Sequence, residues 1–290
     1  AGVFREKVNE SWKGKLHLWL TDNTHIADIG PVSGEGDDVA ASSLLYKSEG
    51  GTNELIALYE KKGSGEASVG MVPVRLTEQL ERVKEVVKTW KEVDERVSQL
   101  CTTLLAQKFT STGAACSADK ITDGLVGFLS GNYSDDTWID EYLGVNATVK
   151  VKEEAVKATE TFDGVTFKGA WAEWRVCKQG QNQPYHFANY NFTLVATVSI
   201  DGEPTQEGPI PLMGVRQNDE KKKTNLWSCH TGKEGNGRYC AVGSRRRSTS
   251  AIGGQVQHTK WPLCYRTAPM AQFTLTVSVW IRHVNWKMRI

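Results

Sequence analysis

Apolar and polar residues alternate in short runs over the first part of the chain. The clearest run is Leu16-His17-Leu18-Trp19-Leu20, and Gly-, Ser- and Asp-rich clusters separate it from later runs. Such runs between turn signals predict an antiparallel meander of strands. About sixty residues of this kind make one sheet with little to cover its faces, so we expect it to belong to a larger domain that begins upstream of Ala1. The further runs lie at residues 25–29, 44–46, 53–59 and 69–74.

The period of the pattern lengthens from two residues to between three and four after residue 75. Glu78 and Glu81 fall in the first turn that this period defines, which suits the helix dipole, and Pro73 precedes it. The pattern therefore predicts one amphipathic helix over residues 76–101, about 38 Å long. Its apolar positions are Leu76, Leu80, Val83, Val87, Trp90, Val93, Val97 and Leu100.

Strand-like runs return between residue 121 and about residue 220. Trp171, Trp174, Phe187 and Phe192 supply aromatic mass for a core. Many short strands without a helical period predict an all-β sandwich or jelly roll. The runs are residues 124–130, 146–151, 161–169, 170–176, 192–200 and 210–214.

Two cysteines flank a loop rich in Ser, Thr, Ala and Gly. Cys101 ends the predicted helix and Cys116 follows the loop. A disulfide between them would close a short loop and stabilise the fold by about 3 kcal/mol. Their spacing does not fit a zinc site, and the six histidines are scattered. We expect no metal ion and no cofactor.

Four Asn-X-Ser/Thr sequences are candidate sites of N-glycosylation. The acceptors are Asn9, Asn132, Asn146 and Asn191. Together with a disulfide they indicate the secretory pathway, so we predict a protein of the cell surface or a secreted one. No apolar run approaches the roughly 18 residues of a membrane-spanning helix.

Charge is divided unevenly along the chain. Residues 1–224 hold 25 basic and 33 acidic side chains, whereas residues 225–290 hold 10 basic side chains and a single acid, Glu234. A basic tail with three tryptophans could bind nucleic acid or a membrane surface.

Four long segments closely resemble the trypanosomal trans-sialidase superfamily. They are LHLWLTDNTHIADIGPVSG at 16–34, residues 75–101, ITDGLVGFLSGNYSDDTWIDEYLGVNAT at 121–148, and YHFANYNFTLVATVSI at 185–200. The resemblance covers about residues 12–224 and is greatest to the non-enzymatic surface-glycoprotein branch. Within it, residues 134–138 depart from the Asp box of sialidase propellers, and we interpret them as a turn followed by a core Trp.

The resemblance implies a mainly β protein with five parts. Residues 1–75 would be the C-terminal part of a six-bladed sialidase β-propeller, 76–101 the linking helix and 102–120 the disulfide loop. Residues 121–224 would begin a concanavalin-A-like jelly-roll (lectin-like) domain, and 225–290 would be an unrelated tail.

Sialidase chemistry needs side chains that the resemblance places at two positions of this chain. An arginine triad holds the sialic acid carboxylate, because the planar fork bonds both oxygens, and a tyrosine is the nucleophile. The third arginine falls at Lys13, or at Lys15 if the register shifts, and the tyrosine falls at Ala41. Tyr46 lies five residues further on. The two replacements predict a catalytically inactive protein.

In the family, inactive members bind host glycans or matrix proteins, so we expect such partners, no nucleic acid, and a monomer. Two alternatives remain. One is an active exo-α-sialidase or trans-sialidase that uses a displaced nucleophile, and the other is a non-functional gene fragment.

A shift of the reading frame would explain the basic tail. Codons allowed for Trp261 to Pro269 read Val-Ala-Ile-Val-Leu-Gln-Asn-Gly-Thr in another frame, which resembles a strand of the lectin-like domain. We therefore predict that the resemblance stops at Lys223 and that residues from about Asn225 are out of frame, with the Lys221-Lys222-Lys223 run as the slip site. The shift would remove part of the jelly roll and a lipid-anchor signal. We expect a poorly ordered tail, with a strand at residues 273–281.

Overall fold

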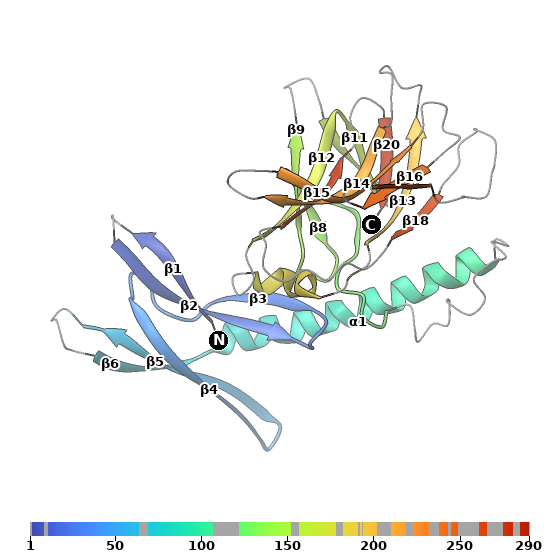
Figure 1. Cartoon of the computed structure of the whole chain (residues 1–290). Coiled ribbons are helices and arrows are strands. Elements are labelled where there is room, and N and C mark those ends of the chain that lie inside the picture. Colours follow the sequence, from blue (N-terminus) through green and yellow to red (C-terminus); the bar gives the residue numbers. More distant parts are fainter. Residues whose placement is uncertain are drawn as a thin grey trace. The chain divides into compact units, whose positions relative to one another are not determined.

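The chain folds into two compact units, residues 1–125 and 126–290 (Figure 1). The computed structural model describes residues 2–8, 11–63, 69–106, 122–151, 157–177, 182–190, 192, 194–201, 210–218, 223–231, 238–242, 245–248, 261–265, 275–280 and 285–289. The expectation of a mainly β protein with one long helix is confirmed for these residues.

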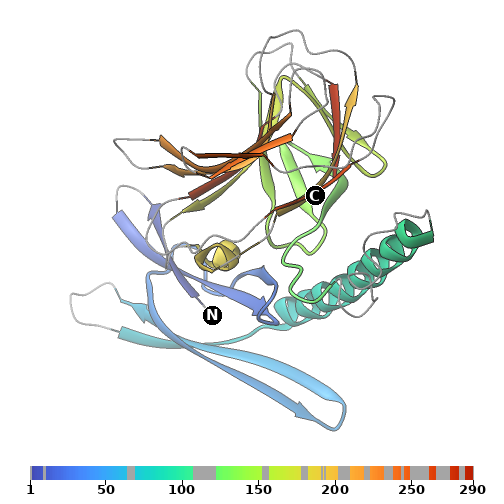
Figure 2. The ribbon, with the colours of Figure 1, turned by 45° about the vertical axis from the view of Figure 1, so that its right-hand side comes forward.

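The first unit contains two three-stranded antiparallel sheets, in the orders β1-β2-β3 and β4-β5-β6. Alternation along β2 buries Leu16 and Leu18, and alternation along β5 buries Leu55, Ala57 and Tyr59. Figure 2 shows β4 and β5 as a long hairpin. The strands are β1 (Gly2–Val8), β2 (Ser11–Thr21), β3 (Ile26–Pro31), β4 (Val39–Glu49), β5 (Thr52–Lys62) and β6 (Val69–Arg75). Every predicted run of this region is confirmed as a strand.

The predicted helix is present as α1 (Thr77–Ala106), with Val86, Trp90, Val93 and Val97 buried along its apolar face. The start of the helix is attached to β5, because the amide of Leu76 donates to the carbonyl of Leu55 at 2.8 Å. The helix continues past Cys101, so the predicted end and the start of the predicted loop at 102–120 were wrong. No Gly or Pro interrupts residues 102–106, and these two residues are the usual helix breakers.

The described residues of the second unit form two antiparallel sheets. One has nine strands in the order β17-β16-β15-β14-β19-β12-β9-β8-β7, and the other has five in the order β10-β11-β20-β13-β18. The strands are β7 (Leu129–Ser134), β8 (Thr137–Asp140), β9 (Ala147–Val151), β10 (Lys157–Thr161), β11 (Gly164–Lys168), β12 (Ala170–Cys177), β13 (Leu194–Asp201), β14 (Ile210–Asn218), β15 (Lys223–Thr231), β16 (Arg238–Val242), β17 (Arg245–Ser248), β18 (Trp261–Tyr265), β19 (Leu275–Trp280) and β20 (Asn285–Arg289), with a 3₁₀ helix η1 (Gln183–Asn189).

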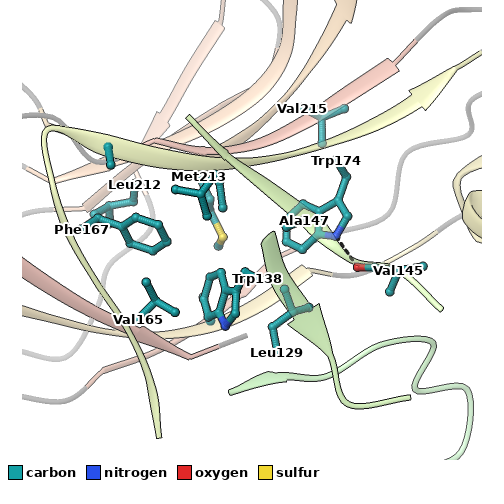
Figure 3. Packing of buried hydrophobic residues seen from close by; sticks show 14 of the residues in the cluster. Leu129, Trp138, Val145, Ala147, Val165, Phe167, Trp174, Leu212, Met213 and Val215 are labelled. Atoms are coloured by element: carbon teal, nitrogen blue, oxygen red, sulfur yellow. Dashed lines mark hydrogen bonds between the residues drawn. The ribbon is translucent and has the colours of Figure 1, made fainter. Parts of the chain in front are cut away.

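Side chains from both sheets form the core of the second unit (Figure 3). Trp138 of β8 meets Phe167 of β11 edge to face, with ring centroids 5.5 Å apart. The indole of Trp174 is buried and donates to the carbonyl of Val145 at 2.7 Å. Trp138 is fully buried directly after a turn in which Asp135 has positive φ, which confirms the interpretation of residues 134–138.

The described tail residues lie in strands. β15 pairs with β14, and β19 lies between β12 and β14 in the nine-stranded sheet. The strand predicted at residues 273–281 is confirmed as β19. The described tail residues form strands, against the expected poor order, and the rest of the tail lies outside the described residues. Alternating residues give β19 the pattern that a paired strand needs.

Candidate functional site at the contact between β2 and β4

Strands β2 and β4 come into close contact at Gly14. A Cβ atom at Gly14 would lie much closer than 3.0 Å to the carbonyl oxygen of Val39, so only glycine fits there. The amide of Gly14 donates to Oδ1 of Asp38 at 2.8 Å. The family resemblance implies that the positions of Lys13 and Ala41 are catalytic in relatives. Both positions flank this contact, because Lys13 precedes Gly14 and Ala41 follows Val39 by two residues.

Lys13 is half-buried, and its ammonium is already bonded within the protein. Nζ donates to the carbonyl oxygen of Gly36 at 3.0 Å. An ammonium is a point charge without the planar fork that binds both oxygens of a carboxylate. Lys13 therefore lacks the geometry of a triad arginine, and its side chain secures the loop before β4.

Ala41 is exposed on β4, and its side chain is a methyl group. The ladder between β4 and β5 is irregular here, since Val39 pairs with Lys61 and the next pair along the ladder is Ser42 with Tyr59. A methyl group has no lone pair, so nucleophilic attack from this position is impossible.

Two tyrosines near the contact could be considered as displaced nucleophiles. Tyr46 is exposed on β4, opposite Leu55 and five residues from Ala41. Tyr59 is buried, and its hydroxyl donates to Oδ2 of Asp37 at 2.8 Å. Burial, aided by the bond to Asp37, raises the pKa of Tyr59. Because a nucleophilic tyrosine needs an accessible and easily ionised phenol, Tyr59 is poorly suited to the role.

Two carboxylates line the same loop. The Lys61 ammonium lowers the pKa of Asp37, and the Gly14 amide, with Lys62, lowers the pKa of Asp38. Burial opposes both effects without overcoming them. A general acid must hold a proton near neutral pH, so these charged and bonded groups suit structure better than proton donation.

The predicted modification sites lie outside the contact between β2 and β4, and the structure describes only some of them. Asn132 and Asn146 are described and exposed. Asn9, Asn191 and Cys116 lie outside the described residues, as does the side chain of Cys101. The predicted disulfide and all four glycosylation sites stay predictions. Within the described residues, no group of three His, Cys, Asp or Glu side chains could hold a metal ion.

Asp140 is a structural site that the sequence did not reveal. Its carboxylate is fully buried and accepts hydrogen bonds from the amides of Phe128, Tyr142, Gly144 and Val145, at 2.8–3.3 Å. Burial raises the pKa of Asp140, although the four amides act in the opposite direction. These hydrogen bonds join residue 128 to residues 142–145 through one carboxylate, and no local sequence motif marks it.

Comparisons with known proteins agree with this architecture. Residues 121–261 match the family described as "Trans-sialidase, C-terminal domain", and residues 2–60 match the "BNR repeat-like domain". The resemblance therefore extends past Lys223, where we had expected it to stop. No helix in the described part of the chain has both the length and the hydrophobicity that crossing a membrane requires.

Known sialidases are similar in sequence and in structure. "Sialidase 85-1.1" of Trypanosoma cruzi is 36% identical over 202 residues, which are 67% of this chain and 22% of that protein. The Trypanosoma rangeli sialidase in complex with sialic acid superposes with a TM-score of 0.72 at 26% identity, covering 99% of this chain and 50% of that one. The same enzyme with 2,3-difluorosialic acid, titled a covalent intermediate, gives a TM-score of 0.70 at 27% identity, with coverage of 99% and 49%.

This chain is mainly β, and its two parts match a BNR repeat-like domain and a trans-sialidase C-terminal domain, which together define a sialidase-like protein. The chain belongs to the trans-sialidase superfamily. It spans about a fifth of the length of the curated relative and half of the solved sialidases.

Proposed function

We propose that this chain is part of a trans-sialidase-like surface glycoprotein that neither hydrolyses nor transfers sialic acid. The observation that carries the proposal is the methyl group of Ala41 at the position where the resemblance places the nucleophile. The bond from Lys13 to Gly36 supports it independently. Tyr59 does not offer a replacement, since its hydroxyl is buried against Asp37.

A sialidase assay on the full-length gene product tests this proposal. The protein is incubated with a fluorogenic sialoside, with Trypanosoma rangeli sialidase as the positive control. We expect no release of the fluorophore above the rate with heat-denatured protein. Turnover that is lost when Tyr46 or Tyr59 is changed to Phe would favour an active enzyme with a displaced nucleophile and would refute the proposal.

The role of the inactive protein would be adhesion to host glycans or matrix proteins from the cell surface or as a secreted monomer. This role rests on the family resemblance. The test is binding of the full-length product to immobilised sialylated glycans, the same glycans after desialylation, and laminin- or fibronectin-type matrix proteins. Saturable binding to one class supports adhesion, and absence of binding to all of them contradicts it.

The reading frame of the tail is a separate proposal. A single-base shift near codon 223 would explain the loss of acidic residues after Glu234 and the alternative translation of residues 261–269. The family match to residue 261 weighs against a shift as early as codon 223. A gene with such a shift would encode a truncated product, which is the non-functional alternative.

A further inference from the structure

Strand β7 ends the nine-stranded sheet, and the described strands include no partner on its outer side. An end strand presents unpaired amide and carbonyl groups, to which the edge of another protein molecule can add. Folded proteins cover or distort such edges to prevent this. Strand β7 has such a distortion, as its pairing with β8 shows.

The middle of β7 departs from regular pairing. Leu129 pairs with Asp140 and Tyr133 with Trp138, so residues 130–132 lie opposite the single residue Ile139. The displaced carbonyl of Ser130 accepts a hydrogen bond from the indole of Trp138 at 2.6 Å. A bulge of this kind bends an edge strand and interrupts its row of hydrogen-bonding groups.

Glycine at position 131 holds the bulge against the other sheet. A Cβ atom at Gly131 would lie closer than 3.0 Å to the carbonyl oxygens of Thr161 and Phe162, in the turn between β10 and β11. Gly131 is buried, and the next residue, Asn132, is exposed, as strand alternation requires. The fold thus presents Asn132 to solvent at the most distorted point of the edge.

Asn132 is also the acceptor of the sequence Asn132-Tyr133-Ser134, and Ser134 is exposed as well. We propose that Asn132 carries an N-linked glycan that covers the open edge of β7 and prevents edge-to-edge association of the domain. The proposal rests on the proposed function only in that the chain must enter the secretory pathway.

The modification is a group transfer to the side-chain amide. Nδ2 of Asn132 forms a bond to the anomeric carbon of a lipid-linked oligosaccharide and loses one proton to solvent. The bond between that carbon and the lipid pyrophosphate breaks, and the lipid pyrophosphate leaves. A bulky, hydrated glycan at this place excludes a second strand because main-chain pairing needs the strands about 4.8 Å apart.

Asn146 provides an internal comparison. It precedes β9, the third strand from the edge, and its Oδ1 accepts the amide of Asp140 at 2.8 Å. Its sequence is completed by the exposed Thr148. A glycan at Asn146 would not lie on the edge strand, so its loss should leave the association state unchanged.

The experiment secretes the full chain, fused to a cleavable signal peptide, from cells that perform N-glycosylation. Glycan occupancy is measured by peptide mass spectrometry after enzymatic deglycosylation, which converts each occupied Asn to Asp. Molecular mass is measured by light scattering for the wild type, Ser134→Ala and Thr148→Ala. Ser134→Ala keeps Asn132 and removes the acceptor sequence, together with one exposed hydrogen bond from Oγ of Ser134 to Oδ2 of Asp135 at 3.2 Å.

We expect Asn132 to be occupied. Ser134→Ala should increase the protein mass at least about twofold at concentrations where wild type and Thr148→Ala are monomeric. Folded wild type that is deglycosylated after purification should associate in the same way, which covers the case that Ser134→Ala fails to fold. An unmodified Asn132 in the secreted protein, or a monomeric deglycosylated protein, would overturn the proposal. Neither outcome affects the sialoside assay, so the two proposals fail separately.

Discussion

The backbone amide of Gly14 donates a 2.8 Å hydrogen bond to the side-chain carboxylate of Asp38. This bond joins β2 to the loop that leads into β4, and it lies beside the two positions at which relatives would need an arginine and a tyrosine. Under the proposed function, the backbone scaffold of the site is present while the arginine and tyrosine side chains for the chemistry are absent. Scaffold and chemistry can be tested separately.

Substitution of Gly14 should destabilise the contact between the two strands. In Gly14→Ala the new methyl group meets the carbonyl oxygen of Val39, and rigid backbone cannot move aside cheaply. We expect a loss of about 1–3 kcal/mol, as for other overpacked interiors. Urea denaturation followed by tryptophan fluorescence measures it.

The matched control for that substitution is Gly70→Ala on β6. Its Cβ would lie 4.0 Å from the nearest atom, the carbonyl oxygen of Lys61, which is an ordinary contact. Equal stability of Gly14→Ala and Gly70→Ala would contradict the close packing of β2 on β4.

Acid should weaken the same contact. The Gly14 amide and Lys62 lower the pKa of Asp38 below its ordinary value of 3.8. A carboxyl group whose pKa is lowered by folding stabilises the folded state above that ordinary value, and this contribution is lost as pH falls through the lower, folded pKa. The stability difference between wild type and Asp38→Asn should thus be constant above about pH 5 and shrink below pH 3.8. Urea titrations at several pH values measure it, and a difference that grows with acid would refute the assignment.

Replacement of the Asp140 carboxyl group by an amide should unfold the loop that it organises. In Asp140→Asn an NH₂ group replaces one of the two acceptor oxygens. The backbone amides of Gly144 and Val145 both donate to Oδ2, and in one orientation of the asparagine they would face this NH₂ group. Each buried amide left without a partner costs about 1–3 kcal/mol. We expect a lower thermal midpoint and faster hydrogen exchange at residues 144 and 145.

Asp135→Asn is the control for the replacement of a carboxyl group by an amide, because Asp135 is exposed and asparagine tolerates its positive φ. Its stability should change by less than about 0.5 kcal/mol. If Asp140→Asn proves as mild as Asp135→Asn, the four amide bonds do not organise the loop.

The gene sequence decides the frame of the tail. If a frame change is correct, insertion or removal of one base between codons 221 and 261 regenerates an acidic, family-like sequence beyond it. The measurement is sequencing of the locus together with mass spectrometry of peptides from residues 238–289. Detection of the tail peptides with no family-like sequence in either other frame would contradict the shift.

Local patterns predicted most of the fold, because burial on one face produces a regular period. The apolar stripe around Trp90 was sufficient to predict α1, and the alternation at Leu16–Leu20 was sufficient to predict β2. The short strand β8 was missed because Thr137–Asp140 is only four residues long. Asp140 was missed because its role comes from backbone amides, which carry no sequence signal. Ala41 and Lys13 were identified through family resemblance, because a replaced catalytic residue can be recognised only by comparison with relatives that have the residue.

Covalent trapping tests the central claim most directly. The full-length product is incubated with 2,3-difluorosialic acid, with which Trypanosoma rangeli sialidase has been solved as a covalent intermediate, and the intact mass of the protein is measured beside that enzyme. Because Ala41 has no nucleophilic atom, we predict an unchanged mass while the control enzyme gains one inhibitor residue. A stoichiometric adduct on any tyrosine of this protein would contradict the account.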